Sequence, residues 1–276
     1  MTPPEFIHTD LTGARFERVP LRQARFRAVD FSGSVMRAVS LEGVDIDGDI
    51  GGLKINGVPI APLVEAELRR RQPARAYWNA TDPVDLRAAW GSLQGTWEEL
   101  DRRVVGMPAG TADVSVDDEW SYTQTLRHLV CATDTWFTAP LRGPAGFHPW
   151  GLPFTDMAQF VPEGTDFGLD PAATPSWAEV LEVRAERVGL VGAFLAEADA
   201  EQLAREVPAP PWADSGQITL LQGVQVIIEE ECEHQRFAER DLNRIEDGAS
   251  PTPSPPHAVT SQWTGSAGYA PDRPNG

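Results

Sequence analysis

A five-residue repeat near the N-terminus restricts the fold more than any other feature of this sequence. Large apolar residues recur at every fifth position from Phe6 to Ile46, and a small or β-branched residue stands two positions before each following large one. Neither an α-helix nor a flat strand has this period, whereas a square-sectioned β-solenoid places five residues on each side. We therefore predict a short right-handed β-solenoid over residues 1–52, in which the large and small residues of each repeat point inward.

The repeat resembles the pentapeptide repeat family over about residues 6–47, where nine successive five-residue units keep one register. This length makes only about two coils, so at least one end needs a cap. Some members of that family mimic DNA with long acidic solenoids, but here arginines stand beside the acids at the exposed positions. We therefore expect a structural role or the docking of a protein partner, and not DNA mimicry.

The segment after the repeats, residues 53–80, has the signals of a capping hairpin, a short helix and a linker. Asn56-Gly57 predicts a tight hairpin turn. A short helix from Val64 to Arg71 ends before Pro73, because the residue before a proline disfavours helical geometry.

Four longer amphipathic patterns over residues 81–247 predict a four-helix bundle, so the fold class of the whole chain is multidomain α+β. A start signal precedes each pattern: Asp82-Pro83, Ser121 with Gln124, Thr174-Pro175, and Thr219 with Gln222. The connection between the second and third patterns, residues 141–173, is long and rich in Gly, Pro and aromatic residues. Long crossovers of this kind often carry function.

Composition excludes several classes of protein. The chain has 41 acidic and 23 basic residues and a net charge of -18, which disfavours binding to nucleic acids and to anionic membranes. It has no apolar run long enough to span a membrane and no signal-peptide pattern at its start. Cys131 and Cys232 lie within amphipathic patterns, so we expect buried thiols in a reducing compartment and a cytoplasmic protein. The Pro- and Ser-rich residues 248–276 predict a disordered tail.

Three polar residues on apolar helix faces are candidates for a metal site. Glu230 and His234 are four residues apart, so they share one face of the fourth predicted helix. With His128 from the second helix they would supply three ligands of a catalytic metal and leave one coordination position open. Spacing alone leaves other interpretations open, namely a salt bridge for Glu230 and a hydrogen-bonded core position for His128. The neighbouring acids are expected to face solvent: Glu229, Glu231 and Glu233.

At these residues the chain, over residues 81–247, resembles the DinB superfamily of four-helix metalloproteins. In that family a histidine on the second helix joins two residues one turn apart on the fourth. Many members have histidine at both of these last positions, whereas the branch that includes mycothiol-dependent maleylpyruvate isomerase has glutamate and then histidine. His128 matches the first position, and Glu230 followed by His234 matches the second pattern. The resemblance therefore implies a divalent metal on these three residues, with zinc expected and nickel or iron also suited to the ligands.

The resemblance also implies a chemistry. A metal held by neutral imidazoles and one carboxylate is a Lewis acid, so a thiol at its open position loses its proton near neutral pH and becomes a nucleophile. We therefore expect a transferase or isomerase that uses a low-molecular-weight thiol such as mycothiol and an electrophilic substrate. Two alternatives stay open: a noncatalytic module that binds a metal or ligand while its solenoid docks a protein partner, and hydrolysis through metal-bound water. Three arginines are candidates to hold an anionic cofactor or substrate, if they are not simply exposed helix residues: Arg127, Arg236 and Arg240.

We expect the substrate pocket at the metal end of the bundle, beneath the crossover. The candidate substrate-binding residues are Trp120, Trp136, Phe147, His148 and Trp150. Trp136 follows His128 by eight residues and so shares its helical face, and Trp120 stands just before the helix start. Aromatic walls there would exclude water and strengthen the effect of the metal charge. The alternatives are core packing for Trp136 and loop packing for His148.

Overall fold

The computed structural model describes residues 4–248, except for residues 144–145, 155–156, 158–160, 162, 171, 212 and 214–215. It divides into two compact units, Met1–Ser40 and Leu41–Gly276, and each is described by itself. The predicted disordered tail lies outside the described residues, apart from Gly248. No helix in the described part of the chain combines the length and the apolarity needed to cross a membrane.

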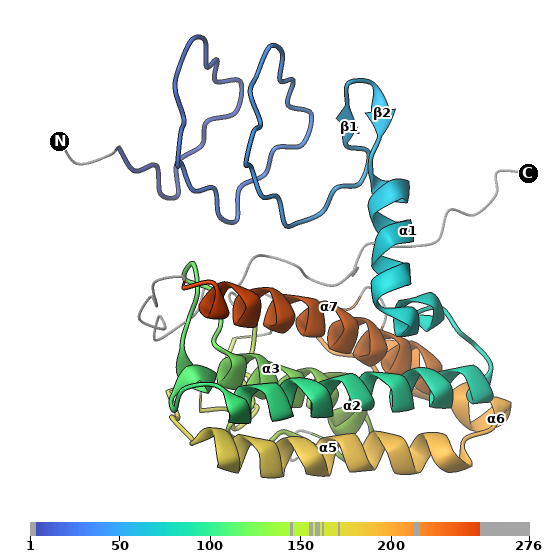
Figure 1. Ribbon diagram of the computed structural model, residues 1–276. Helices are drawn as coiled ribbons and strands as arrows, with labels where there is room; N and C mark the ends of the chain where they lie inside the picture. The colour runs from blue at the N-terminus through green and yellow to red at the C-terminus, as the bar shows by residue number, and fades with distance from the viewer. Residues whose placement is uncertain are drawn as a thin grey trace, which may run out of the picture. The chain divides into compact units, whose positions relative to one another are not determined.

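The smaller unit turns regularly with the period of the repeat. Backbone hydrogen bonds close turns at ten-residue intervals, which is every second repeat. They run from Ala14 N–H to Leu11 O (2.9 Å), from Ala24 N–H to Leu21 O (3.1 Å) and from Ser34 N–H to Phe31 O (3.0 Å). Asp10 accepts the backbone N–H of the residue two positions on, at 2.8 Å. Figure 1 shows the trace of this unit as successive loops without helices or arrows. The spacing of the repeat therefore sets the spacing of the turns.

The expected inward packing of the repeat is not observed. No described residue before Lys54 belongs to a β-strand, and the side chains of Phe16 and Phe26 are 58% and 57% exposed. Phe26 packs edge to face against Phe31 with ring centroids 5.4 Å apart. In a long solenoid each coil covers the next, whereas two coils have too few neighbours to cover their apolar residues. The pentapeptide repeats therefore form a regular series of turns, and a β-solenoid remains a prediction.

The larger unit begins with a hairpin and a short helix. Strands β1 (Lys54–Ile55) and β2 (Val58–Pro59) pair antiparallel around Asn56-Gly57, whose φ values of 51° and 82° suit a tight hairpin turn. Helix α1 (Ala61–Arg71) follows and begins before the predicted Val64. The 3-10 helix η1 (Pro73–Tyr77) then leads toward the bundle.

Four long helices form the bundle: α2 (Pro83–Gly106), α3 (Tyr122–Thr133), α5 (Trp177–Glu197) and α7 (Leu220–Glu246). Helices α2 and α3 each pack against both α5 and α7, which gives a four-sided arrangement (Figure 1). The predicted start signals cap α2, α3 and α7, since Asp82, Ser121 and Thr219 each accept a backbone N–H of the first turn. Helix α5 instead begins after a Ser176–Glu179 capping box, just past the predicted Thr174-Pro175.

Shorter elements connect the long helices. After α2 come η2 (Thr111–Asp113) and, beyond α3, the π-helix η3 (Asp134–Thr138) with α4 (Ala139–Arg142). Between α5 and α7 lie α6 (Ala200–Leu203) and the antiparallel strands β3 (Glu206–Pro208) and β4 (Gln217–Thr219).

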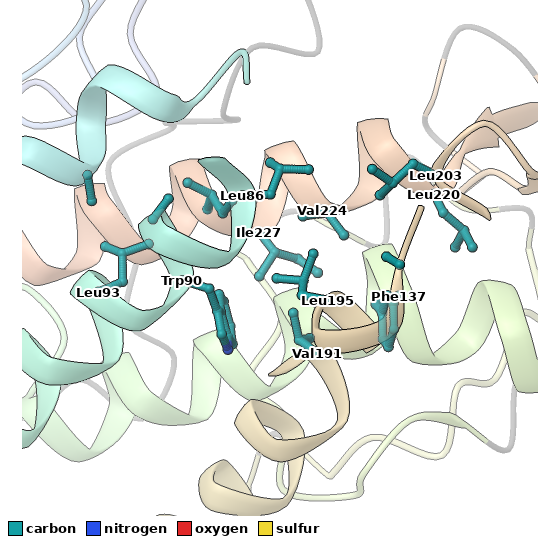
Figure 2. Packing of buried hydrophobic residues seen from close by; sticks show 14 of the residues in the cluster. Leu86, Trp90, Leu93, Phe137, Val191, Leu195, Leu203, Leu220, Val224 and Ile227 are labelled. Carbon is teal, nitrogen blue, oxygen red and sulfur yellow. The ribbon is translucent and has the colours of Figure 1, made fainter. Parts of the chain in front are cut away.

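Two apolar clusters fill the bundle. One joins residues of α2, α5 and α7, including Leu86, Trp90, Val191, Leu195 and Ile227 (Figure 2). The other lies toward the opposite ends of α2 and α7 and includes Trp97, Leu126, Leu129, Val180 and Leu242. Each fully buried leucine contributes about 2 kcal/mol through the hydrophobic effect. Along α7 the first cluster ends at Cys232 and the second begins at Ala238, so the candidate metal ligands stand where the two clusters meet.

Candidate metal centre

The structure brings His128, Glu230 and His234 together between α3 and α7. Their candidate ligand atoms all lie within 4.8 Å of one another. Oε2 of Glu230 is 3.5 Å from Nε2 of His128 and 3.3 Å from Nδ1 of His234. Because α3 packs against α7, the shared face of Glu230 and His234 meets the helix that carries His128.

Backbone carbonyls fix the orientation of both imidazoles. Nδ1 of His128 lies 3.0 Å from the carbonyl oxygen of Leu152, and Nδ1 of His234 lies 2.9 Å from the carbonyl oxygen of Glu230. A carbonyl oxygen can only accept a hydrogen bond, so Nδ1 of each ring carries the proton. Nε2 of His128, the ring atom that lies 3.5 Å from Glu230, therefore keeps its lone pair for a ligand bond, the arrangement found around metal-binding histidines.

The electrostatics of the site suit a cation. The three side chains are only 10–16% exposed. Burial raises the pKa of Glu230, but its contacts with His128 and His234 lower it, and the pKa lies below its usual value. Burial, together with the nearby His128, lowers the pKa of His234 to about 4. At neutral pH the site thus offers a carboxylate and an uncharged His234, which are the protonation states that a divalent ion requires.

Comparison with known protein families gives two matches. The model of the DinB superfamily matches residues 92–238, which include all three candidate ligands, and the model of pentapeptide repeats matches residues 5–37 in 8 copies. The chain belongs to the DinB superfamily. Searches of curated proteins and of solved structures found no match.

Trp120 is a candidate wall residue that contacts the candidate metal site. Its ring centroid lies 4.6 Å from that of His128 and 6.2 Å from that of His234, whose ring it stacks against. Trp120 is buried and packs with Leu152, the residue whose carbonyl orients His128. On the other side, Phe237 lies edge to face with His234, at 5.6 Å between centroids. Sequence reasoning missed Phe237 as a site residue, although it follows His234 by nearly one turn on the same helix.

The other four wall candidates make their described contacts elsewhere. Trp136 packs against the apolar cluster of α2, α5 and α7, and Phe147 packs against Phe167 at 4.9 Å between centroids. His148 and Trp150 pack against each other at 5.1 Å. Trp136 does not share the helical face of His128 as predicted, because it lies in the π-helix η3. A π-helical turn holds one extra residue, so the eight-residue spacing no longer returns to the same face. A substrate contact for these four residues stays a prediction.

The crossover is tied to α3 through Arg127, the residue before His128. Arg127 donates from Nε to the carbonyl of Trp150 and from Nη1 to the carbonyl of Ala173, each at 2.8 Å. The N–H of Leu152 donates to the carbonyl of Arg127 at 3.0 Å. Arg127 is buried and satisfied by loop carbonyls, so it positions the crossover and does not hold an anion.

The prediction that the neighbouring acids face solvent is wrong for two of them. Glu231 is fully buried and forms an ion pair with Arg184, whose Nη2 contacts both carboxylate oxygens. Glu233 is also buried and pairs with Arg75 and Arg236. Arg184 and Arg75 come from distant segments of the chain, so no local pattern around Glu231 or Glu233 reveals these two partners. Glu229 is partly buried.

Proposed function

We propose that this protein holds a divalent metal on His128, Glu230 and His234 and catalyses a thiol-dependent transfer or isomerisation. The observation that carries the proposal is the convergence of one candidate ligand atom from each of the three residues within 4.8 Å, with the imidazole of His128 oriented by the carbonyl of Leu152. A hydrogen-bonded core histidine would need no second histidine and no buried carboxylate beside it.

The donor set fits the ion that we propose. Two imidazole nitrogens and one carboxylate suit zinc, and they also suit nickel and iron. A divalent ion bound there supplies Lewis acidity, which lowers the pKa of a thiol or water at its open position. Trp120 limits the access of water on one side of the imidazoles, and Glu230 supplies negative charge that offsets the charge of the ion.

The thiol in this reaction has to come from a small molecule. Both cysteines are buried, and burial raises the pKa of Cys131 and that of Cys232 to about 12. A buried thiol that stays protonated at neutral pH is a poor nucleophile. We therefore propose a low-molecular-weight thiol such as mycothiol as cosubstrate, attacking an electrophilic small molecule.

Cobalt substitution tests this function. Metal-free protein would be loaded with Co²⁺ and titrated with mycothiol while the near-ultraviolet sulfur-to-cobalt charge-transfer band is recorded. The proposed function predicts a band that saturates with the thiol and is absent from the His234→Ala variant. Cobalt bound without any thiol-dependent band would favour the noncatalytic module instead.

A second role is favoured by the repeat segment. Its large apolar side chains are exposed, including Phe16, Phe26 and Met36, and exposed apolar surface of this kind marks interaction sites. We propose that these repeats form a short solenoid that docks a protein partner. Serine substitutions at Phe16 and Phe26 should leave metal content and the unfolding midpoint of the DinB helices unchanged, whereas a lowered midpoint would assign the two residues to folding.

A further inference from the structure

Two arginines of α7 bind one carboxylate from a distant segment of the larger unit. Arg236 donates from both terminal nitrogens to the two oxygens of Asp47, at 3.0 and 2.9 Å. Arg240 adds a third hydrogen bond to Asp47 at 2.7 Å. A forked, two-oxygen contact of this type is how guanidinium groups recognise carboxylates in general.

Asp47 is not needed to neutralise the two arginines. Arg236 also pairs with Glu233 at 2.8 Å, and Arg240 also pairs with Asp241 at 2.7 Å. Both of these acids lie on α7 itself, so each arginine keeps a partner when Asp47 leaves. The side chains of Asp47, Arg236 and Arg240 are 25–28% exposed, so solvent and solutes reach the contact.

The pair lies close to the proposed metal site. The guanidinium carbons of Arg236 and Arg240 stand 4.4 and 5.3 Å from the ring centroid of Phe237. The same ring lies edge to face with His234, at 5.6 Å between centroids. Phe237 therefore contacts both a candidate metal ligand and the two arginines.

The residue that follows Asp47 lies in open space. Glycine follows Asp47 directly, and a Cβ atom built on Gly48 would meet no heavy atom within 4 Å. Two more glycines follow at positions 51 and 52. Glycine gives the backbone conformational freedom, so Asp47 can leave the arginines without disturbing a packed core.

We propose that Arg236 and Arg240 form the binding site for a carboxylate group of the small-molecule substrate, and that Asp47 occupies this site until the substrate displaces it. The identification of the ligand as the substrate rests on the proposed function, whereas the carboxylate site itself does not. The substrate then belongs to the class of small carboxylates, and Asp47 is a competitor for the site.

Succinate binding by metal-free protein tests the proposal, because without the metal a carboxylate cannot bind there instead. Calorimetric titration would compare wild type with Asp47→Asn, which keeps the size of the side chain and removes its charge. The variant should bind succinate at least about tenfold more tightly, because charge-assisted hydrogen bonds to the arginines no longer have a competitor. Adding Arg240→Gln to Asp47→Asn should abolish the gain, and uncharged succinamide should not bind.

Glu246→Gln is the matched control. It removes the carboxylate that Arg103 of α2 holds in a similar fork of 3.0 and 2.8 Å, and leaves Arg103 its hydrogen bond to Asn243. An equal gain in succinate affinity in this control, or no gain in Asp47→Asn, would overturn the proposal and leave Asp47 with a structural role only.

A second measurement on the wild type applies if Asp47→Asn fails to fold. Succinate should shift the ¹⁵N signals of arginine Nε in Arg236 and Arg240 but not in Arg103, and unshifted signals would refute the site. Succinate binding by a protein that binds no metal would retain this inference while rejecting the proposed function.

Discussion

Arg127 lies outside the proposed metal triad but connects to it through a chain of hydrogen bonds. Its guanidinium holds the carbonyls of Trp150 and Ala173, and its backbone carbonyl holds the N–H of Leu152. The carbonyl of Leu152 in turn accepts the Nδ1 proton of His128. The orientation of a metal ligand thus depends on a residue next to it that faces the crossover.

Arg127→Gln should therefore weaken metal binding without removing a ligand. Loss of such an outer hydrogen bond lowers metal affinity by about 10- to 100-fold. Competition with a chromophoric chelator measures the dissociation constant, with the exposed Arg102→Gln as control. Arg127→Lys should recover part of the loss. An unchanged dissociation constant in a variant whose crossover has become accessible to protease would show that Leu152 does not orient His128.

His234 makes the stability of the metal-free protein depend on pH. Its pKa is about 4 in the folded chain, below the ordinary value of 6.5. Between these values the unfolded state binds the proton more readily, so this contribution is present above about pH 6.5 and is lost as the pH falls toward 4. Urea unfolding at pH 7, 6 and 5 should show a loss on the order of 2 kcal/mol, and His234→Gln should reduce it. If His234→Gln left the pH dependence of the unfolding free energy unchanged, the effect would belong to other titratable groups.

At the scale of elements, the π-helix η3 and helix α7 depend on each other. A Cβ atom on Gly223 would come within 2.3 Å of the carbonyl oxygen of Trp136, so only glycine lets α7 approach η3 this closely. The extra residue in η3 also turns Trp136 away from the face of His128.

Gly223→Ala should consequently destabilise the protein by about 2 kcal/mol or more, because the clash is with backbone and cannot be relieved by a side-chain rotation. Gly95→Ala in α2 is the matched control. Its Cβ would meet nothing within 4 Å, so it should stabilise the helix by up to about 1 kcal/mol. Chemical denaturation measures both changes, and equal effects of the two substitutions would contradict the close approach.

The sequence predicts these elements only as far as local signals reach. Capping residues and apolar spacing correctly place α2, α3 and α7, because both signals act within a few turns. Glu230 and His234 are predictable as a pair for the same reason. The π-helix and the burial of Glu231 are not predictable, since they depend on Gly223 and Arg184, which lie far along the chain.

At the scale of the whole molecule, the four long helices also pack against the segment that precedes α2. Helix η1 packs against both α2 and α7. It carries Arg75, a buried residue that pairs with Glu65 of α1 and with Glu233 of α7. The segment before α2, predicted as a cap for the repeats, therefore also completes the helical unit.

Two truncations test this extension. A chain of residues 41–276 keeps Arg75 and should fold, whereas a chain of residues 82–276 loses Arg75 and leaves Glu233 with Arg236 as its partner. Removing one partner of a buried ion pair costs about 3–5 kcal/mol, so the shorter chain should be insoluble or melt at a much lower temperature. Equal melting temperatures for the two chains would show that the helices from α2 onward are sufficient.

Metal content tests the central claim most directly. Wild type, purified without chelators and loaded with zinc, should retain about one ion per chain after gel filtration, as measured by plasma mass spectrometry. His128→Ala, Glu230→Ala and His234→Ala should each lose most of it, while the control Glu239→Gln, exposed on the same helix, should keep it. A triple alanine variant that still carries one zinc per chain would contradict the site and the function proposed for it.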